Sequence, residues 1–596
     1  MSDAGPINLV PAISLGGEPL PETSAQFLTE IRVERQFMVP ARCTLRFVDN
    51  GYDITTALLG DGGSSLTLTA PADSRTVFTG TVTALAVEQP PNRLPEVVLT
   101  ALDASWVLGR DLSAATYTEM SLLDVIRQVV GKAGLQVDSQ VTASYLSNQA
   151  LPYLPRAGSV LDLLDEVCRR YGCWWWIAED GTKLTIADHV PDGPATTLAE
   201  QGDGGYPLLA FGARASIQPP SDATVWGWDR AKKQVVTEQT QRPTETLDSS
   251  FAAFALKRPG TVQTGQIPVD STAEGKQVSQ AIVNHLGARA VQAEGTVDGT
   301  GAISLGAKVT VKGFGPLAGT YPVTRVEHVV RQTGWTTRFW SGDRHPTGLA
   351  DVLGGARRAT ATLRTSGLTT AVVTDLKDPD KTGRVKVSYP TLDGESASSG
   401  WARVAAPGGG ADRGSVFVPE VQDEVLVGFE SDDPRHPVVL GGLFSSTTTI
   451  PGTYKIDDSG QLATRSLTSR LGHVVSLNDG SAAADQSIEL VLQGTQTKLH
   501  LGKDNVTLLA DDGKKITLQA GQSKIEMTSD GVTITASTIT LSGQQKVAAS
   551  ASQVQVSATN QLQLSSDAMA QLSGTAEVQV SADGPLTLKG AIVQIN

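Results

Sequence analysis

The chain has 596 residues, of which 40% are hydrophobic and 18% charged, and it contains 60 glycines, 30 prolines and only 5% aromatic residues. This composition is typical of a folded protein with many turns and short strands, so we expect a mainly β chain of roughly four domains at about 150 residues each. The formal net charge of −14 argues against a nucleic-acid partner, and no apolar run approaches the roughly 20 residues that cross a bilayer.

The first residues, MSDAGPINLVPAISLGG, show no basic segment followed by an apolar one. We therefore expect a protein that is made in the cytoplasm without a signal peptide. The three cysteines, Cys43, Cys168 and Cys173, are too few for a disulfide framework and lack zinc spacing. Ordinary buried thiols are predicted at all three positions.

Residues 1–115 alternate apolar and polar side chains between turns rich in Gly, Pro and Asp, which predicts strands. These predicted strands cover residues 27–35, 43–49, 64–70, 76–87 and 96–103. Later segments with the same pattern, at 223–229 and 308–315, predict further strands.

Helical spacing appears in three places: residues 121–135, residues 159–172 and, more weakly, residues 273–293. Ser159 can cap the second of these helices, and Gly172 can end it.

Residues 173–188, CWWWIAEDGTKLTIAD, predict a hairpin that turns at Asp180-Gly181. Its three tryptophans could form a platform for a sugar, but beside a helix they are more often core and interface residues. We interpret them as core.

The second half of the chain changes character after Gly342. Residues 348–368 look like a linker, 369–450 like a compact unit of short strands, and 451–505 like a polar neck with regularly spaced glycines. From residue 506 to residue 596 an apolar–polar–apolar triplet returns about every eight residues, with mostly Ser, Thr, Ala and Gln between. Alternation with period two predicts short strands with one apolar face, and such strands must stack to bury that face.

The compact unit carries several segments in an order that resembles the OB-type barrel of contractile-phage needles and of type VI secretion VgrG spikes. The matching segments are DPDKTGRVKV, the Trp401-Ala402-Arg403 tripeptide, FVPEVQDEVLVGFE and DPRHPVVLGGLF.

The upstream half is similar to the late-control gene D family of phage hubs, through LDLLDEVCRRYGCWWWIAEDGTKLTIAD and GTYPVTRVEHVV. The resemblance implies a hub of β-barrels with a few helical insertions over residues 1–347, followed by the linker at 348–368. It further implies an OB-type barrel at 369–450, a neck at 451–505 and a needle at 506–596.

In such needles the repeat is an intertwined three-chain β-helix, so the resemblance implies a homotrimer. A single-chain solenoid is the alternative. The side chains expected in the axial core are Val532, Ile534, Ile539, Leu541, Val554, Val556, Leu562, Leu564, Val578, Val580, Leu586 and Leu588. A PAAR-like tip protein is expected to dock on Val593, Ile595 and Asn596.

No catalytic, cofactor or metal site is expected, because the sequence contains no HExxH motif and no GxSxG nucleophile elbow. The carboxylate pairs Asp432-Asp433 and Asp511-Asp512 are interpreted as solvated turn residues. The chain ends at Asn596 directly after the last triplet, which we take to leave no room for an effector domain.

The resemblance thus implies a spike and hub of a contractile injection machine, not an enzyme. Its expected partners are two further copies of itself, inner-tube and baseplate proteins at the hub, the tip protein and, transiently, a target membrane. A phage tail, a type VI system and a released phage-tail-like particle all remain open as the parent assembly. The alternative is a secreted or cell-wall hydrolase with a carbohydrate-binding β-helix, but residues 503–596 contain no Trp, Tyr or Phe to bind sugars.

Overall fold

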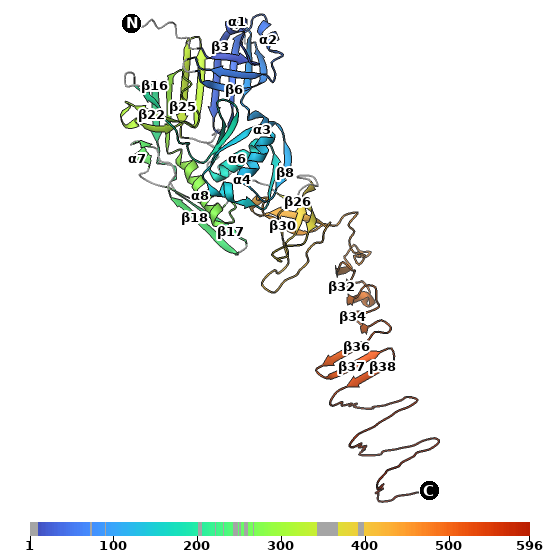
Figure 1. The fold of residues 1–596 in the computed structure, drawn as a ribbon. Helices are drawn as coiled ribbons and strands as arrows, with labels where there is room; N and C mark the ends of the chain where they lie inside the picture. The colour runs from blue at the N-terminus through green and yellow to red at the C-terminus, as the bar shows by residue number, and fades with distance from the viewer. Residues whose placement is uncertain are drawn as a thin grey trace, which may run out of the picture. The chain divides into compact units, whose positions relative to one another are not determined.

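The computed structural model describes most of the chain, which divides into two compact units, Met1–Thr449 and Ile450–Asn596 (Figure 1). The described residues are 10–71, 74–89, 91–200, 205–217, 219–220, 222–230, 232–241, 248–249, 252–255, 260–265, 267–342, 367–390 and 398–595. The linker predicted at 348–368 lies almost entirely outside them.

One long sheet dominates the first unit, in the strand order β19-β23-β22-β15-β16-β21-β25-β24-β3-β4-β7-β6-β5-β1-β2. In chain order its strands are β1 (Ala12–Leu15), β2 (Glu18–Pro19), β3 (Leu28–Gln36), β4 (Val39–Val48), β5 (Ser65–Thr69), β6 (Thr76–Glu88), β7 (Glu96–Leu102), β15 (Thr196–Ala199), β16 (Tyr206–Ala215), β19 (Asp248–Ser249), β21 (Val291–Asp298), β22 (Lys308–Lys312), β23 (Gly319–Pro322), β24 (Arg325–Arg331) and β25 (Gly334–Ser341). The five N-terminal strands predicted from alternation are all present, and β22 fulfils the later prediction at 308–315.

The sheet has two cores: one is built mainly by the N-terminal strands, with Val330 of β24 and Trp335 of β25, and the other by strands from β15 onward. The N-terminal strands meet the later ones where β3 pairs antiparallel with β24, which places Val33 opposite His328. Strand alternation accounts for both cores, since residues such as Leu45 in the first core and Phe339 in the second point inward and are fully buried. The predicted mainly β fold is confirmed.

Helices and smaller sheets complete this part of the first unit. The helices of the unit are α1 (Glu22–Ala25), α2 (Asp53–Leu58), α3 (Trp106–Arg110), α4 (Leu122–Lys132), α5 (Ser144–Asn148), α6 (Val160–Tyr171), α7 (Ala252–Ala255) and α8 (Thr272–Gly287). The small sheets use β8 (Ser113–Tyr117), β9 (Met120–Ser121), β10 (Gln136–Gln140), β11 (Ala150–Leu151), β12 (Leu154–Gly158), β13 (Trp174–Ile177) and β14 (Lys183–Ala187).

Both ends of α6 follow the sequence prediction. The Ser159 hydroxyl accepts from the backbone N–H of Asp162, whose carboxylate accepts from the Ser159 N–H in return. Gly172 ends the helix with φ of 79°, and a Cβ there would lie 2.8 Å from the Cα of Ala281 in α8. Glycine is therefore required twice, for the left-handed turn and for the close approach of the two helices.

The hairpin after α6 is also as predicted, with β13 antiparallel to β14. Trp174 and Trp175 are almost completely buried, so the core interpretation of the tryptophans is confirmed. All three cysteines are buried thiols, and burial raises the pKa of each.

Helix α8 is shorter than predicted. It ends at Gly287, and Val291 starts β21, which pairs with β16 on one side and β25 on the other. Pairing within the sheet outweighs the helical pattern that continued to residue 293. Helix α8 also packs on a three-stranded sheet of β17 (Asp222–Asp229), β18 (Gln234–Gln241) and β20 (Thr261–Thr264). Strand β17 matches the strand predicted at 223–229.

The last part of this unit is a five-stranded sheet in the order β27-β26-β29-β30-β28. Its strands are β26 (Leu368–Asp375), β27 (Lys386–Ser388), β28 (Arg403–Val404), β29 (Glu424–Phe429) and β30 (Pro437–Gly442). Valines such as Val373, Val387 and Val427 form its fully buried core, and Tyr153, from the loop between β11 and β12, completes that core.

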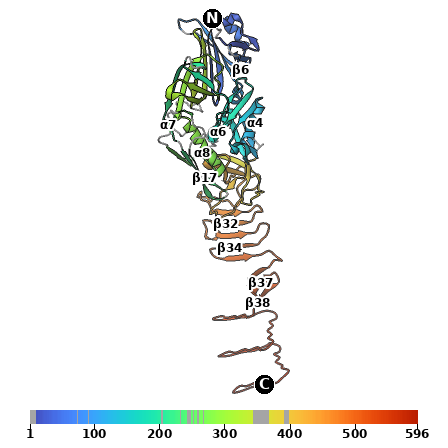
Figure 2. The same ribbon diagram turned by 60° about the vertical axis from the view of Figure 1, so that its left-hand side comes forward.

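The second unit begins with an antiparallel meander, β31-β32-β33-β34-β35 (Figure 2), followed by a three-stranded sheet, β36-β37-β38. Their bounds are β31 (Thr464–Thr468), β32 (Val474–Asp479), β33 (Gln486–Val491), β34 (Lys498–Gly502), β35 (Val506–Leu509), β36 (Ile516–Ala520), β37 (Ser523–Thr528) and β38 (Gly531–Thr535). Four of these strands lie where the sequence predicted only a polar neck.

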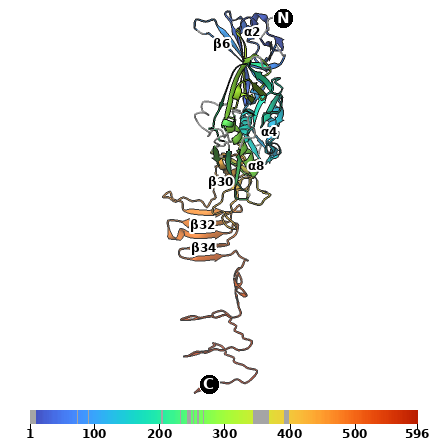
Figure 3. The ribbon, with the colours of Figure 1, turned by 90° about the vertical axis from the view of Figure 1, so that its left-hand side faces the viewer.

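From residue 536 to residue 595 the chain forms no strand with itself (Figure 3). The triplets there keep their alternation, but a strand exists only when another segment accepts and donates its backbone hydrogen bonds. The strands predicted over this stretch are therefore not formed within one chain.

A buried histidine makes the first unit sensitive to acid. His328 in β24 is buried against Trp335 with its Nδ1 3.0 Å from the Thr337 hydroxyl, and burial followed by the charge of Arg35 lowers its pKa to about 3. An unfolded histidine takes up a proton near pH 6.5, so the neutral buried form contributes stability above that pH that is lost progressively as the pH falls toward 3.

We expect His328→Gln, which keeps a polar partner for Thr337 but does not titrate, to lose less stability between pH 7 and pH 5 than the native chain. Urea unfolding followed by tryptophan fluorescence measures this, because all tryptophans lie in the first unit. An identical pH dependence in both proteins would contradict the assignment.

Candidate functional site

The meander in the second unit has one apolar face that its own chain leaves open. Directly opposite residues in neighbouring antiparallel strands point to the same face, so the strand registers define two continuous rows. The first row is Leu467, Val475, Leu490, Leu499 and Leu508, and the second is Leu477, Ile488, Leu501 and Val506. Nearly all of these side chains are exposed; Val506, for example, is 72% exposed. We call this surface the apolar face of the meander.

The same arrangement continues in the three-stranded sheet. Ile516 lies opposite Met527, which in turn lies opposite Val532, and Leu518, Ile525 and Ile534 form the parallel row. Thr517, Glu526 and Thr533 occupy the other face. The alternation predicted from the triplets therefore sorts apolar from polar side chains wherever this part of the chain forms strands.

The twelve side chains predicted to form an axial core all lie exposed in the single chain. Their exposed fractions run from 47% at Val578 to 86% at Leu564. At the C-terminal end Val593 and Ile595 are exposed as well, and Asn596 lies outside the described residues. Nothing in the described part of this chain covers the row.

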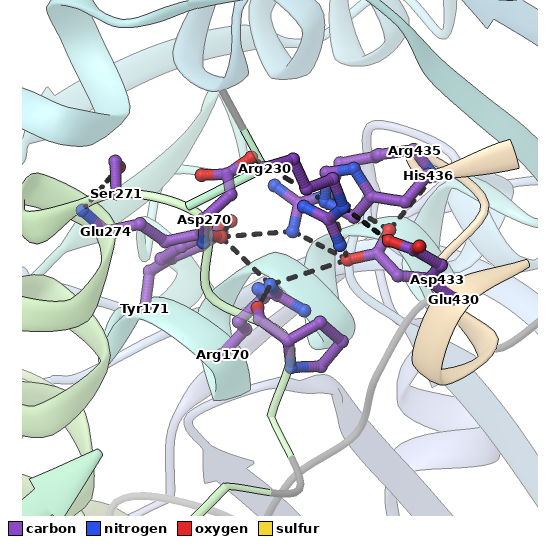
Figure 4. Close-up of polar contacts among 11 residues, drawn as sticks. Arg170, Tyr171, Arg230, Asp270, Ser271, Glu274, Glu430, Asp433, Arg435 and His436 are labelled. Atoms are coloured by element: carbon purple, nitrogen blue, oxygen red, sulfur yellow. Dashed lines mark hydrogen bonds and ion pairs between the residues drawn. The ribbon is translucent and has the colours of Figure 1, made fainter. Parts of the chain in front are cut away.

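A second candidate site was not foreseen: a buried ring of four charged side chains in the first unit (Figure 4). Arg170 from α6 and Glu274 from α8 meet Asp433 and Arg435, which precede β30. All four are almost fully buried. Asp433 was interpreted as a solvated turn residue, and that interpretation is wrong, because its carboxylate is 1% exposed and lies between two arginines.

We call Arg170, Glu274, Asp433 and Arg435 the ion ring. Positively and negatively charged groups alternate around it. The Glu274 Oε1 atom is 2.9 Å from a terminal nitrogen of Arg170 and 3.1 Å from one of Arg435. The Asp433 Oδ2 atom is 2.7 Å from the same Arg435 nitrogen and 3.6 Å from that of Arg170. Each carboxylate thus faces both guanidiniums, which compensates the cost of burying four charges.

The ring decides the protonation of its carboxylates. Burial by itself would raise the pKa of Glu274, but Arg435 and Arg170 outweigh it and hold the pKa well below its usual range. Burial acts on Asp433 in the same way, and Arg435 lowers its pKa to about 2. Both groups therefore stay ionised across the physiological range.

Further charges surround the ring. Glu430 accepts from Arg230 at 2.5 Å and also pairs with Arg403. His436 Nε2 lies 3.6 Å from a carboxylate oxygen of Asp270. Burial followed by the charge of Glu274 raises the pKa of Asp270 to about 6. The sequence contains Asp433, Pro434 and Arg435 as a recognisable motif, but it gives no signal that the partner Glu274 lies 161 residues away.

Among the described residues, no group of His, Cys, Asp and Glu is arranged to hold a metal ion. In the same part of the chain no helix combines the length and apolar character that a membrane span needs.

Comparison with known protein families gives two matches. The family described as "Phage tail baseplate hub (GPD)" matches residues 34–334, just over half of the chain. The family described as "Type VI secretion system/phage-baseplate injector OB domain" matches residues 369–444, which contain the five-stranded sheet. The chain belongs to the phage tail baseplate hub family and carries an injector OB domain, as its resemblances implied.

Individual relatives agree over shorter stretches. The type VI secretion spike protein VgrG5 of Pseudomonas aeruginosa is 40% identical over 95 residues, which are 15% of this chain and 12% of that protein. VgrG3 of Vibrio cholerae is 39% identical over 75 residues, 12% of this chain and 7% of that one. The chain thus spans about a tenth of the length of these curated relatives.

A solved structure extends the likeness in fold. The half-lidded PdpA–VgrG complex of Francisella contains a chain that matches 84% of this one and 88% of its own length, with a TM-score of 0.53 at 9% identity. At this identity the likeness shows a shared fold.

The ion ring generates a stability prediction. Glu274→Gln keeps the shape of the side chain but leaves Arg170 and Arg435 short of a buried negative partner, so we expect a loss of about 3–5 kcal/mol in the free energy of unfolding. The matched control is Glu294→Gln, since Glu294 is 60% exposed and 3.7 Å from Arg338. Its expected change is within about 0.5 kcal/mol. Urea unfolding followed by tryptophan fluorescence compares the two, and equal tolerance of both substitutions would contradict the ring.

Proposed function

We propose that this protein is a structural spike and hub of a contractile injection machine and that it works as a homotrimer. The observation that carries the proposal is the uncovered apolar surface of residues 464–595. Membership of the baseplate hub family and the injector OB domain support the same function.

Association follows from the physics of that surface. Burying an exposed Leu, Ile or Val side chain contributes about 1.5–3 kcal/mol, and the two rows of the meander alone contain nine such residues. A contiguous apolar face of this size marks an interaction surface on a folded protein. Three identical faces packed around one axis bury each other and leave the opposite faces, with Ser466, Glu489 and Thr507, in water.

The strand pairing within one chain predicts two kinds of layer in the proposed trimer. Up to Thr535 each strand finds its partner in its own chain, so each protomer supplies one complete face of a three-sided prism. The triplets from Ile539 on have no partner of their own, so their backbone hydrogen bonds come from the other two chains. The three chains then intertwine, which also removes exposed strand edges.

We therefore assign residues 1–347 to the hub, 348–368 to a linker, 369–450 to the OB-type barrel, 451–505 to the neck and 506–596 to the needle. The hub contacts inner-tube and baseplate proteins. The exposed Val593 and Ile595 together with Asn596 receive a PAAR-like tip protein. The needle crosses a target membrane only transiently. The protein acts mechanically, without catalysis, as part of a particle that is assembled in the cytoplasm and acts on cells outside.

The proposal predicts different outcomes for neighbouring substitutions in the repeat. Val556→Asp places three carboxylates around one axis in a dry core, and each unpaired buried charge costs several kcal/mol. Gln555→Asp is the matched control, because strand alternation turns residue 555 outward. We expect Val556→Asp to abolish an SDS-resistant trimer on an unboiled gel and Gln555→Asp to preserve it. If both variants kept the trimer, the axial core would be misassigned.

A further inference from the structure

The ion ring divides into two pairs that are each complete on their own side of a junction. On one side Arg170 and Glu274 come from α6 and α8, and on the other Asp433 and Arg435 belong to the OB domain. We propose that this junction is a reversible joint, at which the OB domain parts from the helices and returns as a folded body.

The strongest contacts of the ring lie within each side. Arg170 donates to Glu274 at 2.9 Å and to the Pro268 carbonyl at 2.5 Å, and the Tyr171 hydroxyl donates to the same Glu274 oxygen at 2.9 Å. In the OB domain, Arg435 donates two hydrogen bonds to the Asp433 carboxylate, from Nε at 3.0 Å and from a terminal nitrogen at 2.7 Å. This two-point geometry is the strong form of an arginine–carboxylate pair.

Within the ring, the contacts that cross the junction are longer than those on each side. Arg435 reaches Glu274 at 3.1 Å, but Arg170 is 3.6 Å from Asp433, beyond hydrogen-bond distance. Glu430, outside the ring, makes a close crossing contact with Arg230 at 2.5 Å and also pairs with Arg403 on its own side. Parting therefore leaves both ring carboxylates, Glu430 and the two ring arginines with a partner of opposite charge, while Arg230, which is 21% exposed, loses its contact with Glu430.

This arrangement lowers the cost of opening. A buried charge left without a partner is strongly destabilising, which makes most buried ion pairs expensive to separate. Here the opening exposes two ion pairs, each neutral overall, to water and leaves no charge of the ring without a partner. Opening this joint therefore costs less free energy than opening an interface at which every ion pair crosses.

The two bodies also have separate cores. The OB domain holds its own cluster of buried residues, among them Val373, Val387 and Val427, and helices α6 and α8 belong to another cluster. Tyr153 alone, within the described core of the OB domain, comes from the other side, and its ring centroid lies 6.4 Å from that of Tyr389. Each body can therefore remain folded while the contact between them opens. In the proposed spike, the joint lets the needle-bearing half separate from the hub. This role rests on the proposed function, but the existence of the joint does not.

Thiol labelling under native conditions tests the joint in the full-length chain. Pro434→Cys places a thiol in the buried junction loop, Val439→Cys places one in the core of the OB domain, and native Cys168 reports on the core around α6. Labelling of each site is followed by peptide mass spectrometry at neutral pH without denaturant. We expect Cys at position 434 to react at least tenfold faster than Cys168 and Cys at position 439 to react as slowly as Cys168.

Two results would overturn the joint. Equal slow rates at all three sites would mean that the junction opens only on global unfolding. Fast labelling at 434 and 439 together would mean that the OB domain unfolds locally instead of parting as a folded body. His436→Cys serves as a second probe of the junction if Pro434→Cys does not fold. Because no probe lies in residues 464–595, the outcome is independent of whether the chain is a trimer.

Discussion

An apolar strand face has to be covered, and residues 464–595 offer a long one that their own chain leaves in water. In the meander the uncovered side chains are aligned across five strands, from Leu467 to Leu508, so the surface is continuous. From residue 536 to residue 595 the backbone forms no strand pairing within the same chain either. Both deficits have the same solution, the close packing of identical chains, and the proposed trimer, needle and mechanical role all depend on it.

In the first unit, by contrast, the chain's own residues bury the apolar side chains and compensate the buried charges. Its long sheet buries two cores, its three longest helices, α4, α6 and α8, begin at serine caps, and four of its most buried charges compensate one another within the ion ring. In the proposed joint, each part keeps its own ion pair and shares it with the other. A machine that must transmit force through one part and later release it can use such a contact.

The sequence revealed features that depend on local chemistry. Alternation located the N-terminal strands, Ser159 and Gly172 marked the ends of α6, and the triplets revealed an apolar face before any pairing was known. The meander was missed because its apolar residues are separated by turns rich in Gly and Ser, so only the register that places Val475 opposite Leu490 turns them into a row. The ion ring was missed because Asp433 looks like any turn residue until Arg170, far away in sequence, lies beside it. Likewise the end of α8 is set by the neighbours of β21, which the sequence around residue 290 does not contain.

The central claim is that this chain is complete only as three copies. Sedimentation equilibrium of the purified full-length protein at micromolar concentration tests it most directly, since it gives mass without assuming a shape. The account predicts a single species with about three times the 62.4 kDa of one chain. A species of 62.4 kDa that persists at micromolar concentration would contradict it.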